Sequence, residues 1–162
     1  MDVSAHDARA EKTDPFLAVP LHGLLELEFV SALDLEPGEV AVEMPTGPGG
    51  VSATGGLHGG AISTLFDVAC ATAAAAGSAW DPAVNMLVTV DLHVRFLARA
   101  RGTRVRATAR VVRAGGALIV VDGRLVDDLG TLVATADFSA MLIPRRDAAA
   151  TTTGSGSDLP DA

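Results

Sequence analysis

The chain has 162 residues, of which 49% are hydrophobic and 4% aromatic, and its formal net charge is −8. This length suits one domain with a substantial core, which Ala and Val must largely build because aromatic residues are scarce. The negative charge argues against nucleic acid as a partner, since contacts to phosphate dominate that affinity.

Polar and small residues dominate both ends of the chain. Residues 1–14 and 145–162 hold few large apolar side chains, so we expect both to be disordered around a domain at 15–144. The N-terminus lacks the charged-then-apolar order of a signal peptide. The longest apolar run contains a carboxylate, Asp67, which argues against a membrane span. We therefore expect a cytoplasmic protein that binds neither membrane nor nucleic acid.

The domain begins with a predicted helical turn and two predicted strands. Residues 16–25 suit a short helical turn, and residues 24–34 then alternate as a strand does. Residues 39–45 repeat the alternation after a turn with Pro and Gly, which predicts a hairpin. The residues expected to share the apolar face of the first strand are Leu25, Leu27 and Phe29.

A Gly-rich turn leads into a long apolar segment. From Ala61 to Ala76 apolar residues recur at spacings of three and four, which predicts one helix that Gly77 ends. The lone Cys70 lies in this segment, so it is interpreted as a small buried side chain, and it excludes an internal disulfide. Asp67 is the only carboxylate of the segment, and its burial costs free energy unless it has a partner or a function.

Four further strands are predicted after the helix, at residues 84–97, 104–113, 117–128 and 131–143. Strict alternation in the first of them separates an apolar face from a polar one. The apolar face holds Met86, Val88, Val90, Leu92, Val94 and Phe96, and the other holds Thr89, Asp91, His93 and Arg95. Two strands, one long helix and four strands predict an α+β fold with an antiparallel sheet.

Basic residues are concentrated in one part of this acidic chain. Of the 12 Lys and Arg residues, seven lie between Arg95 and Arg113, an interval without Asp or Glu. Two interpretations are open: a local site for a small polyanion, or strand positions that carry solvated charges.

One motif carries a resemblance to a known family. The stretch LHGGAISTLFDVACATA contains His58, Gly59 and Gly60, with Asp67 nine positions after the His. It resembles the motif of the hotdog-fold thioesterases of the PaaI-like acyl-CoA thioesterase group. The order of predicted strands agrees as well, so the resemblance covers roughly residues 24–143.

The resemblance implies a long central helix wrapped by a curved antiparallel sheet of about six strands. It further implies that two subunits pair into a continuous sheet, with the active site between them. We therefore expect a homodimer or homotetramer that hydrolyses acyl-CoA to free acid and CoA, without metal or redox cofactor. The apolar strand around residues 86–96 is the edge expected to pair with another chain.

The resemblance also assigns roles to residues. Asp67 matches the general base or nucleophile, the Gly59 N–H matches the donor to the thioester carbonyl, and Thr89 matches a strand hydroxyl that some members use. A helix N-terminus suits such a donor, because its N–H groups lack intrahelical acceptors. Ser52 lies six residues before His58, where many relatives have Asn or Gln. The shorter Ser52 would act through a water, or that role is vacant.

Other residues complete the expected site. His58 is either a general acid or a turn histidine bonded to backbone, and Gly60 lets the substrate approach closely. Ser63 shares a side of the helix with Asp67, as a substrate-binding residue or as a hydroxyl that pairs with this carboxylate. The expected contacts of the CoA phosphates are Arg99, Arg101 and Arg113.

The alternative function is a non-catalytic acyl-CoA-binding hotdog module, in which Ser52 marks a lost catalytic arrangement. The Asp and His motif of hydratases with a related fold is not found. Short, long and aryl acyl groups all remain open, because loops and the partner subunit shape that pocket.

Overall fold

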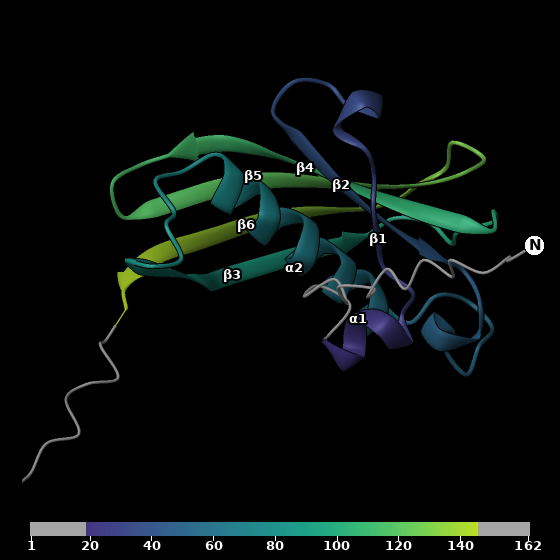
Figure 1. The fold of residues 1–162 in the computed structure, drawn as a ribbon. Coiled ribbons are helices and arrows are strands. Elements are labelled where there is room, and N and C mark those ends of the chain that lie inside the picture. The colour runs from purple at the N-terminus through teal and green to yellow at the C-terminus, as the bar shows by residue number, and fades with distance from the viewer. Residues whose placement is uncertain (1–18, 146–162) are drawn as a thin grey trace, which may run out of the picture.

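The computed structural model describes residues 19–145 and consists of one long helix against a curved sheet (Figure 1). The helices are α1 (Pro20–Leu24) and α2 (Gly59–Ala76), with 3-10 turns at Ala32–Asp34 and Pro48–Gly50. The strands are β1 (Glu28–Phe29), β2 (Glu39–Pro45), β3 (Asn85–Phe96), β4 (Arg104–Ala114), β5 (Leu118–Asp127) and β6 (Leu132–Pro144). The predicted α+β hotdog arrangement is confirmed. The predicted disordered segments, 1–14 and 145–162, lie outside the described residues except for Arg145.

The sheet has the strand order β1-β2-β4-β5-β6-β3, and all neighbouring strands are antiparallel. The hairpins β4–β5 and β5–β6 occupy its centre. β3 precedes them in the chain but pairs with β6, so it forms one edge of the sheet. Its outer side has no strand neighbour within residues 19–145.

Helix α2 packs on the concave face of the sheet, with Phe66 and Phe138 as the largest buried side chains between them. A Cβ built at Gly123 of β5 would lie 2.9 Å from the Phe66 ring, so this glycine permits the close approach of helix and strand. Gly77 ends the helix as predicted, and its N–H donates to the Ala73 carbonyl. By length and composition alone α2 could cross a membrane, but 44% of it is buried as a core helix.

The segment expected to form the first strand is mostly not a strand. The predicted helical turn is present as α1, and only Glu28 and Phe29 of residues 24–34 pair with β2. The chain reverses at Glu26, whose φ of 52° lies in the left-handed region and breaks the alternation. Leu25 and Leu27 are buried as expected, whereas Phe29 is 43% exposed, so the predicted shared face is wrong for Phe29.

Strand β3 does not alternate strictly, because its register with β6 shifts between Thr89 and Asp91. Val90 therefore forms a β-bulge, and the side chains before it point to the opposite face from the one that strict alternation predicts. Thr89 pairs with the buried Ala140 and so faces α2. The predicted faces are right for Leu92, Val94 and Phe96 and wrong for Met86, Val88 and Thr89.

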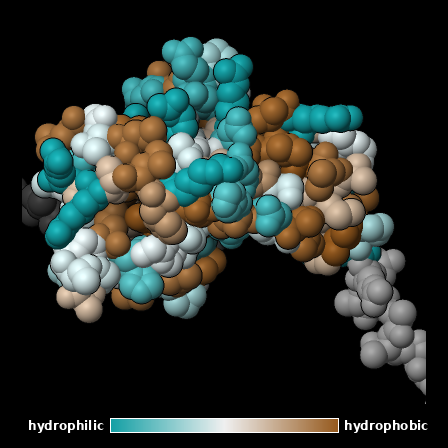
Figure 2. Space-filling model, turned by 180° about the vertical axis from the view of Figure 1, so that it is seen from behind, coloured by the Kyte–Doolittle hydropathy of each residue, from teal (hydrophilic) through white to brown (hydrophobic). Residues whose placement is uncertain are grey.

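Large apolar side chains also remain on the surface, where they lie among polar groups in the view from behind (Figure 2). One group spans three neighbouring strands on the convex face. Val88 of β3 pairs with Met141 of β6, which pairs with Leu118 of β5, and all three side chains are exposed. This apolar row reaches the β3 edge.

Candidate active site

The N-terminus of α2 is capped by the imidazole of His58. Its Nδ1 accepts the Gly60 N–H at 2.9 Å, so this nitrogen carries no proton. A Cβ built at Gly60 would lie 3.0 Å from Nδ1, so a glycine lets the ring fold back onto the helix. This is the backbone-bonded histidine that the sequence offered as one of two interpretations.

Gly59 is the first residue of α2, and its N–H has no acceptor among residues 19–145. The positive end of the helix dipole lies at the same place. A Cβ built at Gly59 would lie 3.4 Å from the Phe96 ring, so the glycine also makes room for this aromatic side chain. The N–H can therefore donate to an oxygen that gains negative charge.

Asp67 lies two turns further along α2 and is half-buried. The Thr89 hydroxyl donates to its Oδ1 at 3.0 Å, across the space between helix and edge strand. The alternative pairing of Asp67 with Ser63 is not observed, because the Ser63 hydroxyl, like that of the neighbouring Thr64, donates to a backbone carbonyl one turn earlier. No cation forms an ion pair with Asp67 in the described part of the chain.

Cys70 is buried one turn after Asp67. Burial, followed by the nearby carboxylates of Asp67 and Asp122, raises the pKa of its thiol to about 12. The thiol is thus protonated at neutral pH and is no nucleophile, as the sequence indicated.

A pocket of about 380 Å³ opens beside the helix N-terminus. Gly59, Phe96 and Arg99 lie in its wall, together with apolar side chains of α2 and β6. Asp67 does not line it. Asp67 and Gly59 lie about 12 Å apart along the helix axis, too far to act on one carbonyl group within one chain.

Arg99 is held at the rim of this pocket. Its Nη2 donates to the Gly55 carbonyl at 2.6 Å, and the guanidinium packs against Gly55 and Gly56. Ser52 begins the same turn, and its hydroxyl bonds the Thr54 hydroxyl at 2.9 Å. The guanidinium forms no ion pair with a described residue, so its charge remains available to an anion.

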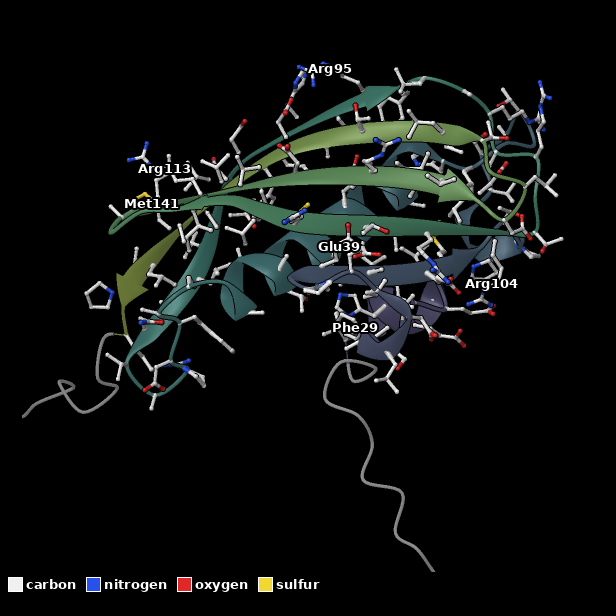
Figure 3. The ribbon with its side chains drawn as sticks, turned by 90° about the horizontal axis from the view of Figure 1, so that it is seen from above. Phe29, Glu39, Arg95, Arg104, Arg113 and Met141 are labelled. Atoms are coloured by element: carbon white, nitrogen blue, oxygen red, sulfur yellow. The ribbon has the colours of Figure 1, made fainter. Side chains whose placement is uncertain are left out.

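Three of the seven arginines of the basic interval are neutralised within the sheet. Arg95, Arg104 and Arg106 form ion pairs with carboxylates of neighbouring strands. Arg101 lies on the same loop as Arg99, whereas Arg113 lies at the opposite end of β4, about 30 Å from Arg104 (Figure 3). The structure thus does not bring Arg113 together with Arg99 in one chain.

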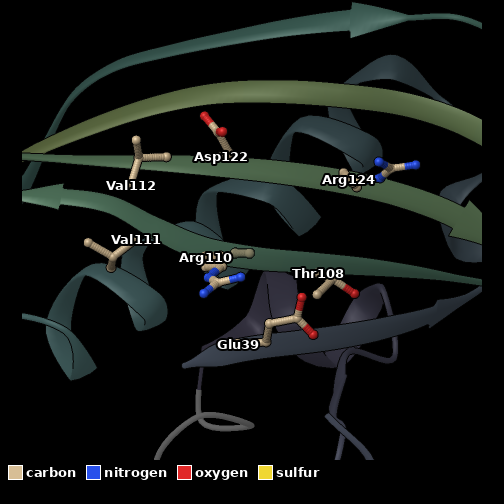
Figure 4. A pocket seen from close by; sticks show the side chains of 8 residues that line it. Glu39, Thr108, Arg110, Val111, Val112, Asp122 and Arg124 are labelled. Atoms are coloured by element: carbon tan, nitrogen blue, oxygen red, sulfur yellow. The ribbon is translucent and has the colours of Figure 1, made fainter. Parts of the chain in front are cut away.

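A second hollow, of about 440 Å³, lies on the convex face over β4 and β5 (Figure 4). Glu39, Arg110, Asp122 and Arg124 surround it, so its wall carries both charges. None of the predicted site residues lines this hollow.

The structure adds two residues that the sequence did not single out. Phe96 was assigned only to an apolar face, yet it contacts Gly59 and lines the pocket. Asp127, at the end of β5, accepts backbone N–H groups of the loop that carries Arg99. The sequence DDLG at residues 127–130 is typical of a tight turn, but no local pattern reveals a partner about 25 residues earlier in the chain.

Comparisons with known proteins show the family and the fold that this chain shares with them. The model of the thioesterase superfamily matches residues 54–134. A thioesterase family protein from Silicibacter pomeroyi is 29% identical, with a TM-score of 0.68, and the match covers 82% of this chain and 95% of that chain. A Bacillus halodurans protein determined with CoA is 28% identical, with a TM-score of 0.68 and coverages of 78% and 80%.

A phenylacetic acid degradation-related protein from Ralstonia eutropha is 27% identical, with a TM-score of 0.65 and coverages of 76% and 89%. The comparison with curated proteins gave no match. The family match spans half of the chain and includes Gly59, Asp67 and Thr89. The chain therefore belongs to the thioesterase superfamily and is a thioester hydrolase.

Proposed function

We propose that the chain is an acyl-CoA thioesterase of the PaaI-like group, in which Asp67 of one protomer and Gly59 of another act on the same thioester. The observation that carries the proposal is Asp67 itself, a half-buried carboxylate with one hydroxyl partner and no ion pair to a described residue. Two similar proteins support an acyl-CoA substrate: the Bacillus halodurans protein determined with CoA, and the Ralstonia eutropha protein related to phenylacetic acid degradation.

Three features favour a site shared between two chains. Asp67 and the Gly59 N–H are too far apart within one chain to act together. The β3 edge beside Asp67 has no strand neighbour within residues 19–145, and such an edge pairs readily with another chain. The exposed row of Val88, Met141 and Leu118 adds apolar surface next to that edge. A two-fold dimer through β3 would place two such sites on one assembly, and two dimers would make a tetramer.

In the proposed reaction Asp67 acts as general base or nucleophile. As a base, it takes a proton from a water molecule, whose oxygen attacks the thioester carbon. The Gly59 N–H of the other protomer donates to the carbonyl oxygen as it becomes an oxyanion. The C–S bond then breaks, and the CoA sulfur leaves with the proton from Asp67. As a nucleophile, Asp67 attacks the thioester carbon, the C–S bond breaks and CoA leaves as a thiolate that takes a proton from solvent, which leaves a mixed anhydride. Water then hydrolyses this anhydride to the free acid and regenerates the Asp67 carboxylate. In both cases the Thr89 bond to Oδ1 orients the carboxylate and leaves Oδ2 for the reaction.

The CoA phosphates are assigned to the loop between β3 and β4. Arg99 has an available charge at the rim of the pocket, and Arg101 follows two residues later. Arg113 is too far away to share this site within one chain. His58, Ser63 and Ser52 support the helix N-terminus and the turn before it through the bonds described above.

Subunit complementation tests the shared site. Asp67→Asn removes the base, and Gly59→Pro removes the N–H while keeping a residue that the first helical position favours. Each variant alone should release almost no CoA from acyl-CoA, measured with a thiol reagent. After co-refolding, the mixture should recover about a quarter of the wild-type activity, because half of the random dimers contain one intact site.

The matched control is one chain that carries both substitutions, co-refolded with the Asp67→Asn chain. It should recover no activity, because neither site of that dimer has both groups. Absence of recovery in the first mixture, with dimers shown by sedimentation, would place both groups in one chain. Binding of acyl-CoA by the wild-type protein without release of CoA would contradict the proposed reaction.

A further inference from the structure

The loop at residues 97–103, between β3 and β4, is fastened to the sheet by one buried carboxylate. Asp127, 4% exposed, accepts four backbone N–H groups. Its Oδ2 accepts from Arg101 at 2.8 Å and from Gly102 at 3.3 Å, both in this loop. Its Oδ1 accepts from Leu129 at 3.1 Å and Thr131 at 2.7 Å, in its own turn. The two oxygens thus join two turns that are distant in sequence.

The four backbone N–H donors stabilise the ionised form of Asp127. The Arg101 N–H first, and the Thr131 and Gly102 donors with it, lower the pKa of the carboxyl to about 2 against the opposing effect of burial. The carboxylate is therefore ionised at neutral pH, and its bonds to the loop are charge-assisted.

Neighbouring residues hold the same end of the loop. Thr46 directly follows β2. Its hydroxyl donates to the Gly102 carbonyl at 2.8 Å, and its N–H donates to the Thr103 carbonyl at 2.8 Å. Asp128 accepts the N–H and the hydroxyl of Thr103. A Cβ at Gly102 would run into the Asp128 side chain, so the loop has no room to shift in that direction.

The other end of this loop forms the wall of the pocket. Ala98, Arg99 and Ala100 line it, and the Arg99 guanidinium spans from the loop to the Gly55 carbonyl. The turn that Arg99 contacts leads directly into His58 and the helix N-terminus. The backbone fastened by Asp127 begins at Arg101, two residues from Arg99.

We propose that Asp127 is a positioning residue for substrate binding: it sets the backbone from which Arg99 reaches the pocket, and so prepares the guanidinium for the CoA phosphates. The inference rests on the proposed acyl-CoA substrate. An arginine side chain loses much conformational freedom when it binds an anion, and a fixed backbone reduces that loss. Asp127 does not touch the substrate in this role.

Asp127→Asn tests the role. The amide of Asn retains one acceptor oxygen. Its NH₂ group is a donor only, so it cannot accept the N–H hydrogen bonds that the second carboxylate oxygen accepts in the wild type. The KM for acyl-CoA should rise about tenfold, comparable to the loss of one charge-assisted hydrogen bond. The KM for the matching acyl-pantetheine, which lacks the nucleotide phosphates, and both kcat values should change little.

A double-mutant cycle distinguishes positioning from general destabilisation. Arg99→Ala alone should raise the KM for acyl-CoA, and Asp127→Asn added to it should raise that KM no further, because the residue acts through Arg99. Asp122→Asn, an exposed carboxylate on the same strand, is the matched control and should leave both KM values unchanged. Additive effects on KM, or equal losses on acyl-CoA and acyl-pantetheine, would overturn the proposal.

Two outcomes separate this inference from the proposed function. If Arg99→Ala leaves the KM for acyl-CoA unchanged, the assignment of the phosphates to Arg99 fails, and the positioning role fails with it. If Arg99→Ala raises that KM and Asp127→Asn does not, only the positioning role fails. If a thermal melt shows that Asp127→Asn does not fold, Thr46→Val serves as the second variant, because it removes one hydrogen bond to the same loop. Thr46→Val should raise the KM for acyl-CoA and leave the KM for acyl-pantetheine unchanged. An equal rise in both KM values would contradict the proposal.

Discussion

The Thr89 hydroxyl donates to Asp67 Oδ1 at 3.0 Å because the bulge at Val90 turns Thr89 toward helix α2. Without the bulge, the period of the strand would place this hydroxyl on the opposite face, with Asp91 and Arg95. One irregular residue at the sheet edge thus orients the carboxylate that we propose as base or nucleophile. Bulges occur at sheet edges and next to active sites, where they redirect a side chain in this way.

Asp67→Asn is the most direct test of the chemistry. The amide keeps the shape of the side chain and an oxygen that can accept from Thr89, but it cannot take a proton or attack as an anion. The kcat should fall by about 10²–10⁴-fold, the usual contribution of general-base assistance, with little change in KM for acyl-CoA. Steady-state release of CoA and a thermal melt measure both. Near-normal turnover in a folded variant would make the carboxylate structural.

Thr89→Val and Thr89→Ser form a matched pair. Valine keeps the branched shape and removes the donor to Asp67, so kcat should fall about tenfold, the effect of one hydrogen bond to a charged group. Serine retains the hydroxyl and should stay within a few-fold of the wild type. Similar kcat values for the two variants would show that the Thr89 bond does not support turnover.

Two substitutions at His58 separate the cap from catalysis. His58→Ala loses the acceptor for the Gly60 N–H and should reduce the free energy of unfolding by about 1 kcal/mol. His58→Asn provides another good capping side chain without an imidazole, so both stability and kcat should remain near the wild-type values. A stable but inactive Asn variant would establish the ring as a general acid instead.

The stability of the protein should fall in strong acid through Asp127. The pKa of this carboxyl is lowered in the folded state, from 3.8 to about 2, so the folded protein binds its proton less readily than the unfolded chain. Asp127 therefore stabilises the folded protein fully when the pH lies above the ordinary pKa of 3.8, and this contribution is lost as the pH falls through the folded-state pKa. Melting temperatures of the wild type and Asp127→Asn should differ by several degrees near pH 6 and converge near pH 2.

The same pH series on Asp122→Asn is the control. The Asp122 side chain is exposed on β5, and its carboxylate accepts no hydrogen bond from a described residue and forms no ion pair with one, so this variant should follow the wild-type curve. A constant difference between the wild type and Asp127→Asn down to pH 2 would contradict the role of the ionised form.

Much of the fold could be predicted from the sequence, because local patterns decide it. The helix followed from apolar spacing between Ala61 and Ala76, and the four later strands followed from alternation and turn residues. The carboxylate Asp67 in an apolar helix and Gly59 at its start are both visible in one short stretch, and the resemblance of that stretch to hotdog-fold thioesterases predicts their roles. These features depend on neighbours within a few residues of each other.

Only the tertiary structure decided which distant residues meet. The bulge at Val90 arises from the register between β3 and β6, which an alternating pattern does not encode. The ion pairs that neutralise Arg104 and Arg106 come from β1 and β2, more than 60 residues earlier in the chain. Asp127 reaches the Arg99 loop for the same reason: strand order brings two turns together at one end of the sheet. Local periodicity thus determined the elements, whereas the pairing of strands determined the partners of the site.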